Sequence, residues 1–201
     1  TQTLEAAVSL FPSVSLDLIF GWAGQTTAQW ENDIKTALDH GPSHISAYQL
    51  TIEPGTAFVR MEARGASKST SETESADFFD IAARAFVSAG FEHYEVSNFA
   101  RKGHRSRHNM TYWQGGDYVG AGPGAHGRLM RSGLRSATIA AMKPEDYKAS
   151  INGTGTGIQD SETLSPLEWA EEYVLMGLRI NGGISMKRFE QISGTSLKKD
   201  R

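Results

Sequence analysis

Residues 106–127, SRHNMTYWQGGDYVGAGPGAHG, place histidine, asparagine, tyrosine and tryptophan side chains directly before a glycine-rich stretch. A segment of cationic and imidazole side chains leads into it: Arg101, Lys102, His104, Arg105 and Arg107. Arginine pairs with carboxylates, a neutral imidazole ligates iron, and aromatic rings stack on flat molecules. The mixture therefore suits a planar, anionic, metal-centred ligand. It suits single-stranded nucleic acid equally well, with rings stacked on bases and cations paired with phosphates. For His108, the alternative is a structural histidine hydrogen-bonded by the backbone.

Asp17 is a further candidate functional residue, because it lies inside an apolar segment between Leu16 and Leu18. A carboxylate in a buried strand is unfavourable unless it is paired or bound to a ligand. At the carboxyl end of such a strand, it would point to the edge where α/β sheets bind ligands. The alternative is a structural aspartate that hydrogen-bonds the next loop.

Two glycine-containing segments match phosphate-binding loops only in part. GWAGQT (21–26) lacks the lysine and serine or threonine of a P-loop, so we expect a turn between strand and helix. GAGPGAHG (120–127) partly matches a dinucleotide fingerprint, but no amphipathic helix follows it to bind a pyrophosphate. We expect these glycines to let the backbone approach a flat ligand closely.

The elements that position Asp17 have a strand–helix–strand order. Leu16–Phe20 predicts a buried strand, and residues 27–41 predict an amphipathic helix that ends at Gly41. Residues 44–52 predict a second strand, closed by the turn EPGT. This order predicts a parallel sheet, and the expected fold class is α/β.

The rest of the chain predicts a polar loop over 62–72, a helix over 74–91, a third strand over 91–100 and a fourth over 117–122. Residues 132–160 are rich in Gly, Ser and Thr, and we expect them to connect the α/β part to a helical module. That module begins with a capping box, in which Ser165 is the N-cap, Pro166 follows at the first helical position and Glu168 is at N3. A short helix is expected over 184–194.

Composition excludes several classes of protein. A net charge of −3 and a pI near 6.1 argue against bulk nucleic-acid binding. The absence of cysteine excludes disulfides and thiolate metal sites within these 201 residues. No segment approaches the roughly 18 apolar residues of a membrane span, and the first residues do not form a signal peptide. Because the chain begins at Thr1 and stops at SLKKDR, we expect a fragment of a longer protein.

Four ordered segments resemble the HemW family of radical S-adenosylmethionine (SAM) haem chaperones, relatives of oxygen-independent coproporphyrinogen III oxidase (HemN). They are DLIFGWAGQT, HISAYQLTIEPGTAF, GFEHYEVSNFARKGHRSRHNMTYW and DYVGAGPGAHG. The resemblance extends over about residues 10–190. It implies the second half of a partial (β/α)₆ TIM-like barrel followed by a small, mainly helical, winged-helix-like module. The expected domains are residues 1–131 for the barrel half with its haem-associated loop, 132–160 for the connector and 161–201 for the start of the module.

The resemblance also implies cofactors and their residues. In the family, an N-terminal Cys-x₃-Cys-x₂-Cys loop holds a [4Fe–4S] cluster whose open iron binds SAM. This chain has no cysteine, so the cluster ligands would belong to a missing N-terminal part and the fragment alone would be inactive. Asp17 matches the family residue that contacts SAM, and Thr51 is a weaker candidate. Trp22 and Ala23 depart from the family's GLPGQT, which leaves the shape of that loop open. The family's haem-associated motif is complete at His108, Asn109, Tyr112 and Trp113, with His108 as the candidate iron ligand.

The implied function is binding of haem and its transfer to an acceptor protein in the cytoplasm. The alternative within the superfamily is oxidative decarboxylation of coproporphyrinogen III. The alternative from another class is a single-stranded RNA-binding module, although the acidic charge and the βαβ order speak against a nucleic-acid partner.

Overall fold

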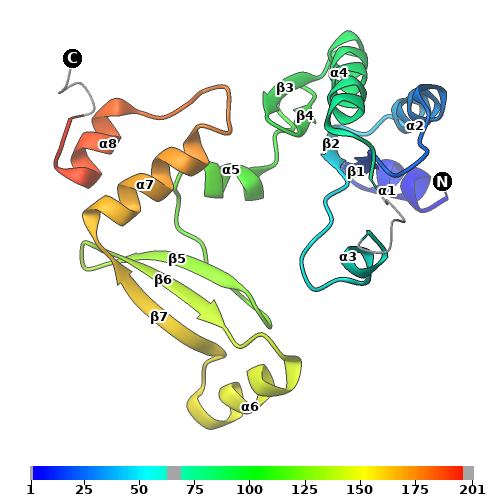
Figure 1. The fold of residues 1–201 in the computed structure, drawn as a ribbon. Coiled ribbons are helices and arrows are strands. Elements are labelled where there is room, and N and C mark those ends of the chain that lie inside the picture. The colour runs from blue at the N-terminus through cyan, green and yellow to red at the C-terminus, as the bar shows by residue number, and fades with distance from the viewer. Residues whose placement is uncertain (1, 63–68, 197–201) are drawn as a thin grey trace. The chain divides into compact units, whose positions relative to one another are not determined.

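Residues 2–62 and 69–196 are described in the computed structural model of the chain, which forms two units, Thr1–Ser106 and Arg107–Arg201 (Figure 1). We call them the N-terminal unit and the C-terminal unit and describe each separately. No helix within the described ranges has the length and apolar composition of a membrane span.

The N-terminal unit is an α/β structure built on one mixed sheet. Its elements are α1 (Gln2–Leu10), β1 (Ser15–Phe20), α2 (Thr27–Asp39), β2 (His44–Gln49), α3 (Ala57–Glu62), α4 (Glu72–Ser88), β3 (Glu92–Glu95) and β4 (Asn98–Ala100). The sheet order is β1-β2-β4-β3. β1 and β2 are parallel, whereas β4 runs antiparallel to both of its neighbours. The predicted βαβ order is therefore confirmed.

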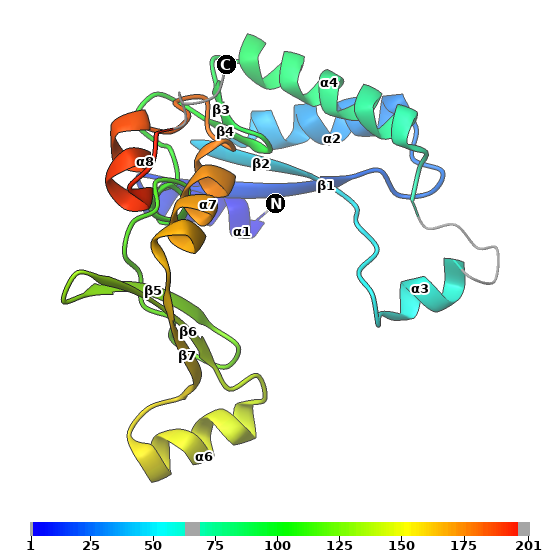
Figure 2. The ribbon, with the colours of Figure 1, turned by 60° about the vertical axis from the view of Figure 1, so that its left-hand side comes forward.

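One face of this sheet is apolar and is covered by α2 and α4, which lie on the same side of it (Figure 2). Alternate residues of a strand point to opposite faces, so Leu18 and Phe20 of β1 reach this core while Asp17 and Ile19 face away. Trp30 of α2 is buried there, and its indole N–H donates to the carbonyl of Phe78 at 2.8 Å. Such tight packing fixes the strands that carry the polar residues of the other face.

The predicted third strand over 91–100 is wrong as a single element, because it forms the hairpin β3–β4. The carboxylate of Glu95 accepts a hydrogen bond from the backbone N–H of Ser97 at 3.0 Å, which closes the turn. Val96 is exposed at its tip. The polar loop predicted over 62–72 lies largely outside the described residues, and α4 begins before its end, with Ser71 as N-cap in a capping box with Glu74.

The C-terminal unit combines an antiparallel sheet with helices. Its elements are α5 (Arg107–Trp113), β5 (His126–Arg131), β6 (Leu134–Ala140), α6 (Pro144–Thr154), β7 (Ile158–Leu164), α7 (Pro166–Gly177) and α8 (Met186–Ser193). The sheet order is β5-β6-β7. The strand predicted over 117–122 is wrong, since only an isolated bridge from Tyr118 to Arg128 forms there. The segment predicted as a connector, 132–160, contains β6, α6 and the start of β7.

The capping box of α7 is confirmed. The Ser165 hydroxyl accepts from the N–H of Glu168 at 3.3 Å, and the Glu168 carboxylate accepts from the N–H of Ser165 at 2.8 Å. The short helix predicted over 184–194 is confirmed as α8, which packs on α7 through Tyr173, Phe189 and Ile192. The two units divide the chain at 106, and the predicted domain boundaries at 131 and 160 stay a prediction.

Candidate functional site

Asp17 lies on the sheet face that points away from α2 and α4. It is the third of six residues of β1, so it does not meet the condition of lying at the carboxyl end of the strand. Asp17 is exposed because side chains alternate along the strand, and the next residue, Leu18, packs against the core on the opposite face. No described residue hydrogen-bonds its carboxylate, which leaves the group available as an acceptor.

A row of buried, hydrogen-bonded polar side chains crosses the same sheet, starting on β2, the strand that pairs with β1. Ser46, opposite Asp17 in the register, donates its hydroxyl to the Asn98 side-chain oxygen at 3.1 Å. The Asn98 amide in turn donates to Glu95, whose carboxylate also takes the Ser97 N–H. Ser46, Asn98 and Glu95 are each at most 2% exposed. The row satisfies a buried carboxylate with hydrogen bonds, as burial requires.

His44 lies in a second polar row on this sheet. Its Nδ1 is 2.8 Å from the Ser15 hydroxyl, and its Nε2 is 2.8 Å from the Tyr94 hydroxyl. Burial lowers the pKa of His44, although the carboxylates of Asp17 and Glu95 oppose the shift. Burial also raises the pKa of Tyr94. A protonated Tyr94 that donates to a neutral His44, which then donates to Ser15, satisfies all three groups.

Sequence reasoning missed His44, Glu95 and Asn98. A signal was present in HISAYQ, where His44, Ser46 and Tyr48 alternate with apolar residues as they do in a strand with one polar face. Thr51 lies two residues beyond the end of β2 and is exposed, and its hydroxyl is 3.4 Å from the carbonyl of Gln49. Its role stays a prediction.

The His-Asn-x-x-Tyr-Trp motif forms most of α5 in the C-terminal unit. His108 is exposed, and its Nε2 is 2.9 Å from the hydroxyl of Tyr112, one helical turn later. Their rings are perpendicular, and Tyr112 makes a similar edge contact with Tyr118 at 4.4 Å between centroids. Trp113 is 8% exposed and Asn109 is partly buried. The structural alternative for His108, a backbone-satisfied histidine, is thus wrong within the described residues.

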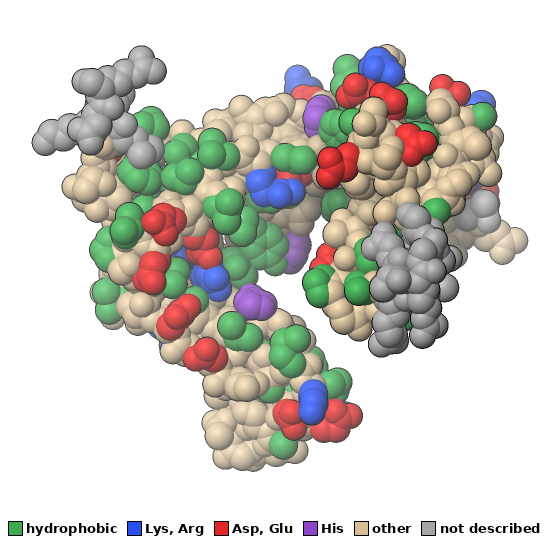
Figure 3. Space-filling view, in the orientation of Figure 1, with side chains coloured by type: hydrophobic (Ala, Val, Ile, Leu, Met, Phe, Trp, Pro, Cys, Tyr) green, Lys and Arg blue, Asp and Glu red, His purple; other side chains and the backbone are tan. Residues whose placement is uncertain are grey.

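Three residues of the basic segment before the motif make contacts within the N-terminal unit. Arg105 pairs with Glu92 at 3.1 Å, and Arg101 lies over the ring of Phe91 with its Cζ 4.5 Å from the centroid. Nδ1 of His104 is 3.2 Å from the hydroxyl of Ser13. On the face seen in Figure 3, acidic side chains are spread over both units and basic ones lie among them. These contacts count against an RNA-binding surface.

The glycines after the motif allow close approach between parts of the chain itself. A Cβ added to Gly120 would lie 2.5 Å from the carbonyl oxygen of His126, and one added to Gly127 would lie 2.6 Å from the Thr138 hydroxyl. Strand β5 follows, not a helix, which counts against the dinucleotide interpretation. Internal packing explains the close approach that we expected beside a flat ligand.

The residues present do not fit a [4Fe–4S] cluster, because the chain has no cysteine. Among the described residues, no group of three or more His, Asp or Glu side chains is placed to hold a metal ion. An exposed imidazole such as His108 fits haem iron, which takes a single protein nitrogen on one side.

Comparison with solved structures shows which known fold this chain shares. The fold matches the solved structure of coproporphyrinogen III oxidase (HemN) from Escherichia coli, a radical SAM enzyme, with a TM-score of 0.74 at 17% identity, over 96% of this chain and 46% of that one. The chain therefore has the fold of that part of a radical SAM protein. No protein-family model matches it.

Sequence similarity narrows the class. The chain is 37% identical over 195 residues to the Mus musculus protein "Radical S-adenosyl methionine domain-containing protein 1, mitochondrial", covering 94% of this chain and 44% of the relative. It is 36% identical over 187 residues to "Heme chaperone HemW" of Bacillus subtilis, covering 93% and 48%. The chain is thus similar to HemW-like proteins over more than nine-tenths of its own length, and it spans about half the length of the curated relatives it matches.

Proposed function

We propose that this chain is part of a HemW-type radical SAM haem chaperone, which binds haem and passes it to an acceptor protein. The observation that carries the proposal is the similarity at 32–36% identity to several proteins named haem chaperone HemW. It extends over more than nine-tenths of the chain. The fold likeness to HemN, at 17% identity, concerns the fold alone and does not favour the oxidase.

His108 is the residue that we propose as haem ligand. Its side chain is exposed on α5, and Tyr112 holds Nε2 at 2.9 Å. If Nε2 donates to the tyrosine oxygen, Nδ1 carries the lone pair that iron requires, and no described residue occupies Nδ1. Such a second hydrogen bond orients the ring and fixes the tautomer of a ligating histidine. Asn109 and Trp113 support the same helix from partly buried and buried positions.

Asp17 and Thr51 are the residues that we propose for SAM. The exposed carboxylate of Asp17 accepts hydrogen bonds and attracts cations, which suits the hydroxyl and ammonium groups of that molecule. In the whole protein, a [4Fe–4S] cluster would supply electrons to SAM, and its thiolate ligands do not come from these 201 residues. Cytoplasmic location stays a prediction, since mouse, zebrafish and cattle relatives carry the word mitochondrial in their names.

Haem titration followed by the Soret band tests the proposal. We expect His108→Ala to shift the band and to weaken haem binding by at least about tenfold, the effect of losing one strong interaction. Tyr112→Phe keeps the ring and removes the bond to Nε2, so we expect a smaller loss of affinity. His40→Ala, at the end of α2, is the matched control. A His108→Ala protein with the wild-type Soret band and affinity would exclude His108 as ligand.

A further inference from the structure

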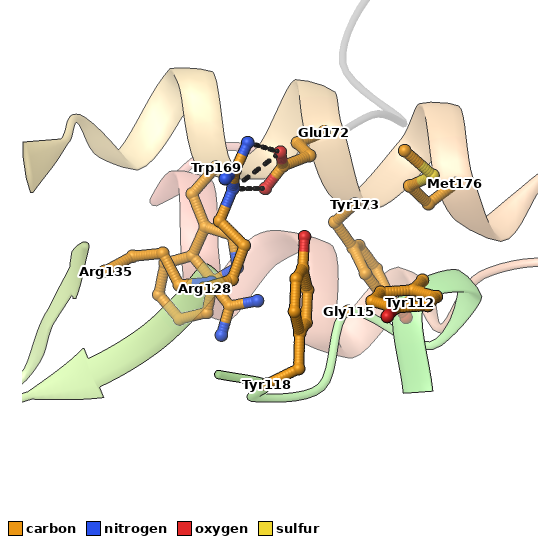
Figure 4. A pocket seen from close by; sticks show the side chains of 9 residues that line it. All are labelled: Tyr112, Gly115, Tyr118, Arg128, Arg135, Trp169, Glu172, Tyr173 and Met176. Carbon is orange, nitrogen blue, oxygen red and sulfur yellow. Dashed lines mark hydrogen bonds and ion pairs between the residues drawn. The ribbon is translucent and has the colours of Figure 1, made fainter. Parts of the chain in front are cut away.

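A small cavity lies in the C-terminal unit beside the motif helix (Figure 4). Its volume is about 70 Å³. Aromatic rings, a methionine, one arginine–glutamate pair and a second arginine surround it. The lining residues are Tyr112, Gly115, Tyr118, Arg128, Arg135, Trp169, Glu172, Tyr173 and Met176. The space holds a few water molecules or the carboxylate end of a short chain, but no ring system.

The formal charges around the cavity are already balanced in pairs. Arg128 binds the Glu172 carboxylate with contacts of 2.8 and 2.9 Å, drawn as dashed lines in Figure 4. Arg135 pairs with Asp117 through one terminal nitrogen and donates to the carbonyl of Gly116 at 2.8 Å through the other. Glu172 and Asp117 are thus already paired with arginines and do not accept hydrogen bonds from the remaining donors at the cavity.

Two buried donors at this cavity lack an acceptor among the described residues. They are Nε of Arg135, a residue only 3% exposed, and the indole Nε1 of Trp169. The two side chains are in contact, with the Arg135 Cζ 5.7 Å from the Trp169 ring centroid. An unpaired buried donor is unfavourable, and two together at one cavity indicate a missing acceptor.

A third donor lines the same space. The hydroxyl of Tyr118 has no hydrogen bond to a described residue, and in Figure 4 it points toward α7. Burial raises the pKa of Tyr118, so the hydroxyl keeps its proton at neutral pH. Three N–H and O–H donors without an acceptor match the oxygens of a carboxylate, which accept and never donate.

We propose that this cavity binds a carboxylate, through the Arg135 Nε, the Trp169 Nε1 and the Tyr118 hydroxyl. Resting on the proposed function, the carboxylate is a propionate arm of the haem that His108 ligates. Tyr112 links the two positions, since it lines the cavity, contacts Tyr118 and hydrogen-bonds His108. Only the arm enters, because the volume excludes the macrocycle, which stays on the surface beside α5.

Titration with sodium propionate tests the cavity without haem. The probe is the indole N–H signal of Trp169 in a proton–nitrogen NMR spectrum, assigned by its loss in Trp169→Phe. We expect a saturable shift of this signal and none of the Trp22 indole, which belongs to the N-terminal unit. A Trp169 signal that does not move at propionate concentrations up to about 100 mM, a range that reaches very weak binding, would mean water fills the cavity and would overturn the proposal.

Comparison of haem with haem dimethyl ester tests the link to the proposed function. Wild type should bind haem about tenfold more tightly than the ester, as expected for losing one charge-assisted hydrogen bond. Trp169→Phe should remove most of this preference, and Trp22→Phe should keep it. Equal binding of haem and ester by wild type overturns the propionate assignment. If propionate shifts Trp169 but wild type binds neither porphyrin, the proposed function fails and the carboxylate site stands.

Discussion

His44 is buried between Ser15 and Tyr94, and its charge state is coupled to folding. Burial lowers its pKa, while Asp17 and Glu95 oppose the shift. The unfolded chain therefore takes up the proton more readily than the folded one. A lowered pKa of this kind contributes stability above the ordinary histidine value of about 6.5, and the contribution is lost as the pH falls below it.

The prediction is that the urea midpoint of the N-terminal unit falls between pH of about 7.5 and about 5.5. His44→Gln should flatten that dependence, because no imidazole remains to be protonated. Asp17→Asn should steepen it, since one of the two opposing carboxylates is gone. Urea unfolding followed by Trp30 fluorescence at several pH values measures both. An unchanged slope in His44→Gln would assign the pH dependence to other groups.

Gly120 illustrates a different residue-scale constraint. A Cβ there meets a backbone oxygen at 2.5 Å, and backbone cannot move aside as a flexible side chain does. We expect Gly120→Ala to destabilise the C-terminal unit by about 1–3 kcal/mol, the usual range for overpacking. Gly153 in α6 has open space around it and serves as the matched site, where alanine should be neutral or stabilising by up to about 1 kcal/mol. Equal denaturation midpoints for the two variants would contradict the close-approach argument.

At the scale of elements, capping explains where α7 begins. Ser165 and Glu168 exchange hydrogen bonds between side chain and backbone at 3.3 and 2.8 Å. We expect Ser165→Ala to cost about 1 kcal/mol in the unfolding free energy of the C-terminal unit, because it leaves one end N–H without a partner. Ser161→Ala in exposed β7 is the control and should change stability by less than about 0.5 kcal/mol. An equal loss of unfolding free energy in both variants would exclude capping as the cause.

The elements that were predicted from sequence are those with strong local signals. Periodic apolar residues located α2 and α4, the apolar strand segment located β1, and the capping box located α7. The sheet of the C-terminal unit was missed because its strands carry little apolar alternation. β7 reads IQDSETL and is almost wholly exposed, so only pairing with β6 identifies it as a strand. Such non-local pairing has no signature in the segment itself.

In the candidate site, too, the features with a local sequence signal were predicted and those that depend on non-local packing were not. His108, Tyr112 and Trp113 were singled out by residue type, and their spacing did place Tyr112 against His108 at one helical turn. The cavity was not predictable, because Arg135 of β6 and Trp169 of α7 are 34 positions apart and meet only in the folded unit. Asp17 lies within β1 and not at its carboxyl end, because β1 continues to Phe20 in parallel pairing with β2.

At the scale of the whole molecule, the two units divide the proposed chemistry. The N-terminal unit carries Asp17 and the polar sheet face, and the C-terminal unit carries His108 and the carboxylate cavity. Each unit has its own hydrophobic core, the first around Trp30 and Phe99 and the second around Tyr173 and Phe189. The residues proposed for haem and those proposed for SAM therefore belong to different units.

The 201 residues by themselves should not assemble a catalytic cluster. A radical SAM reaction needs a [4Fe–4S] cluster held by thiolates, and this chain contains no cysteine. After anaerobic incubation with iron and sulfide, followed by desalting, we expect no stoichiometric iron or acid-labile sulfide on the protein and no 5′-deoxyadenosine from SAM. Haem binding that depends on His108 should survive in the same preparation, because it uses residues that the chain does contain. Iron-dependent release of 5′-deoxyadenosine by the 201 residues alone would require ligands other than cysteine and would refute the division of roles.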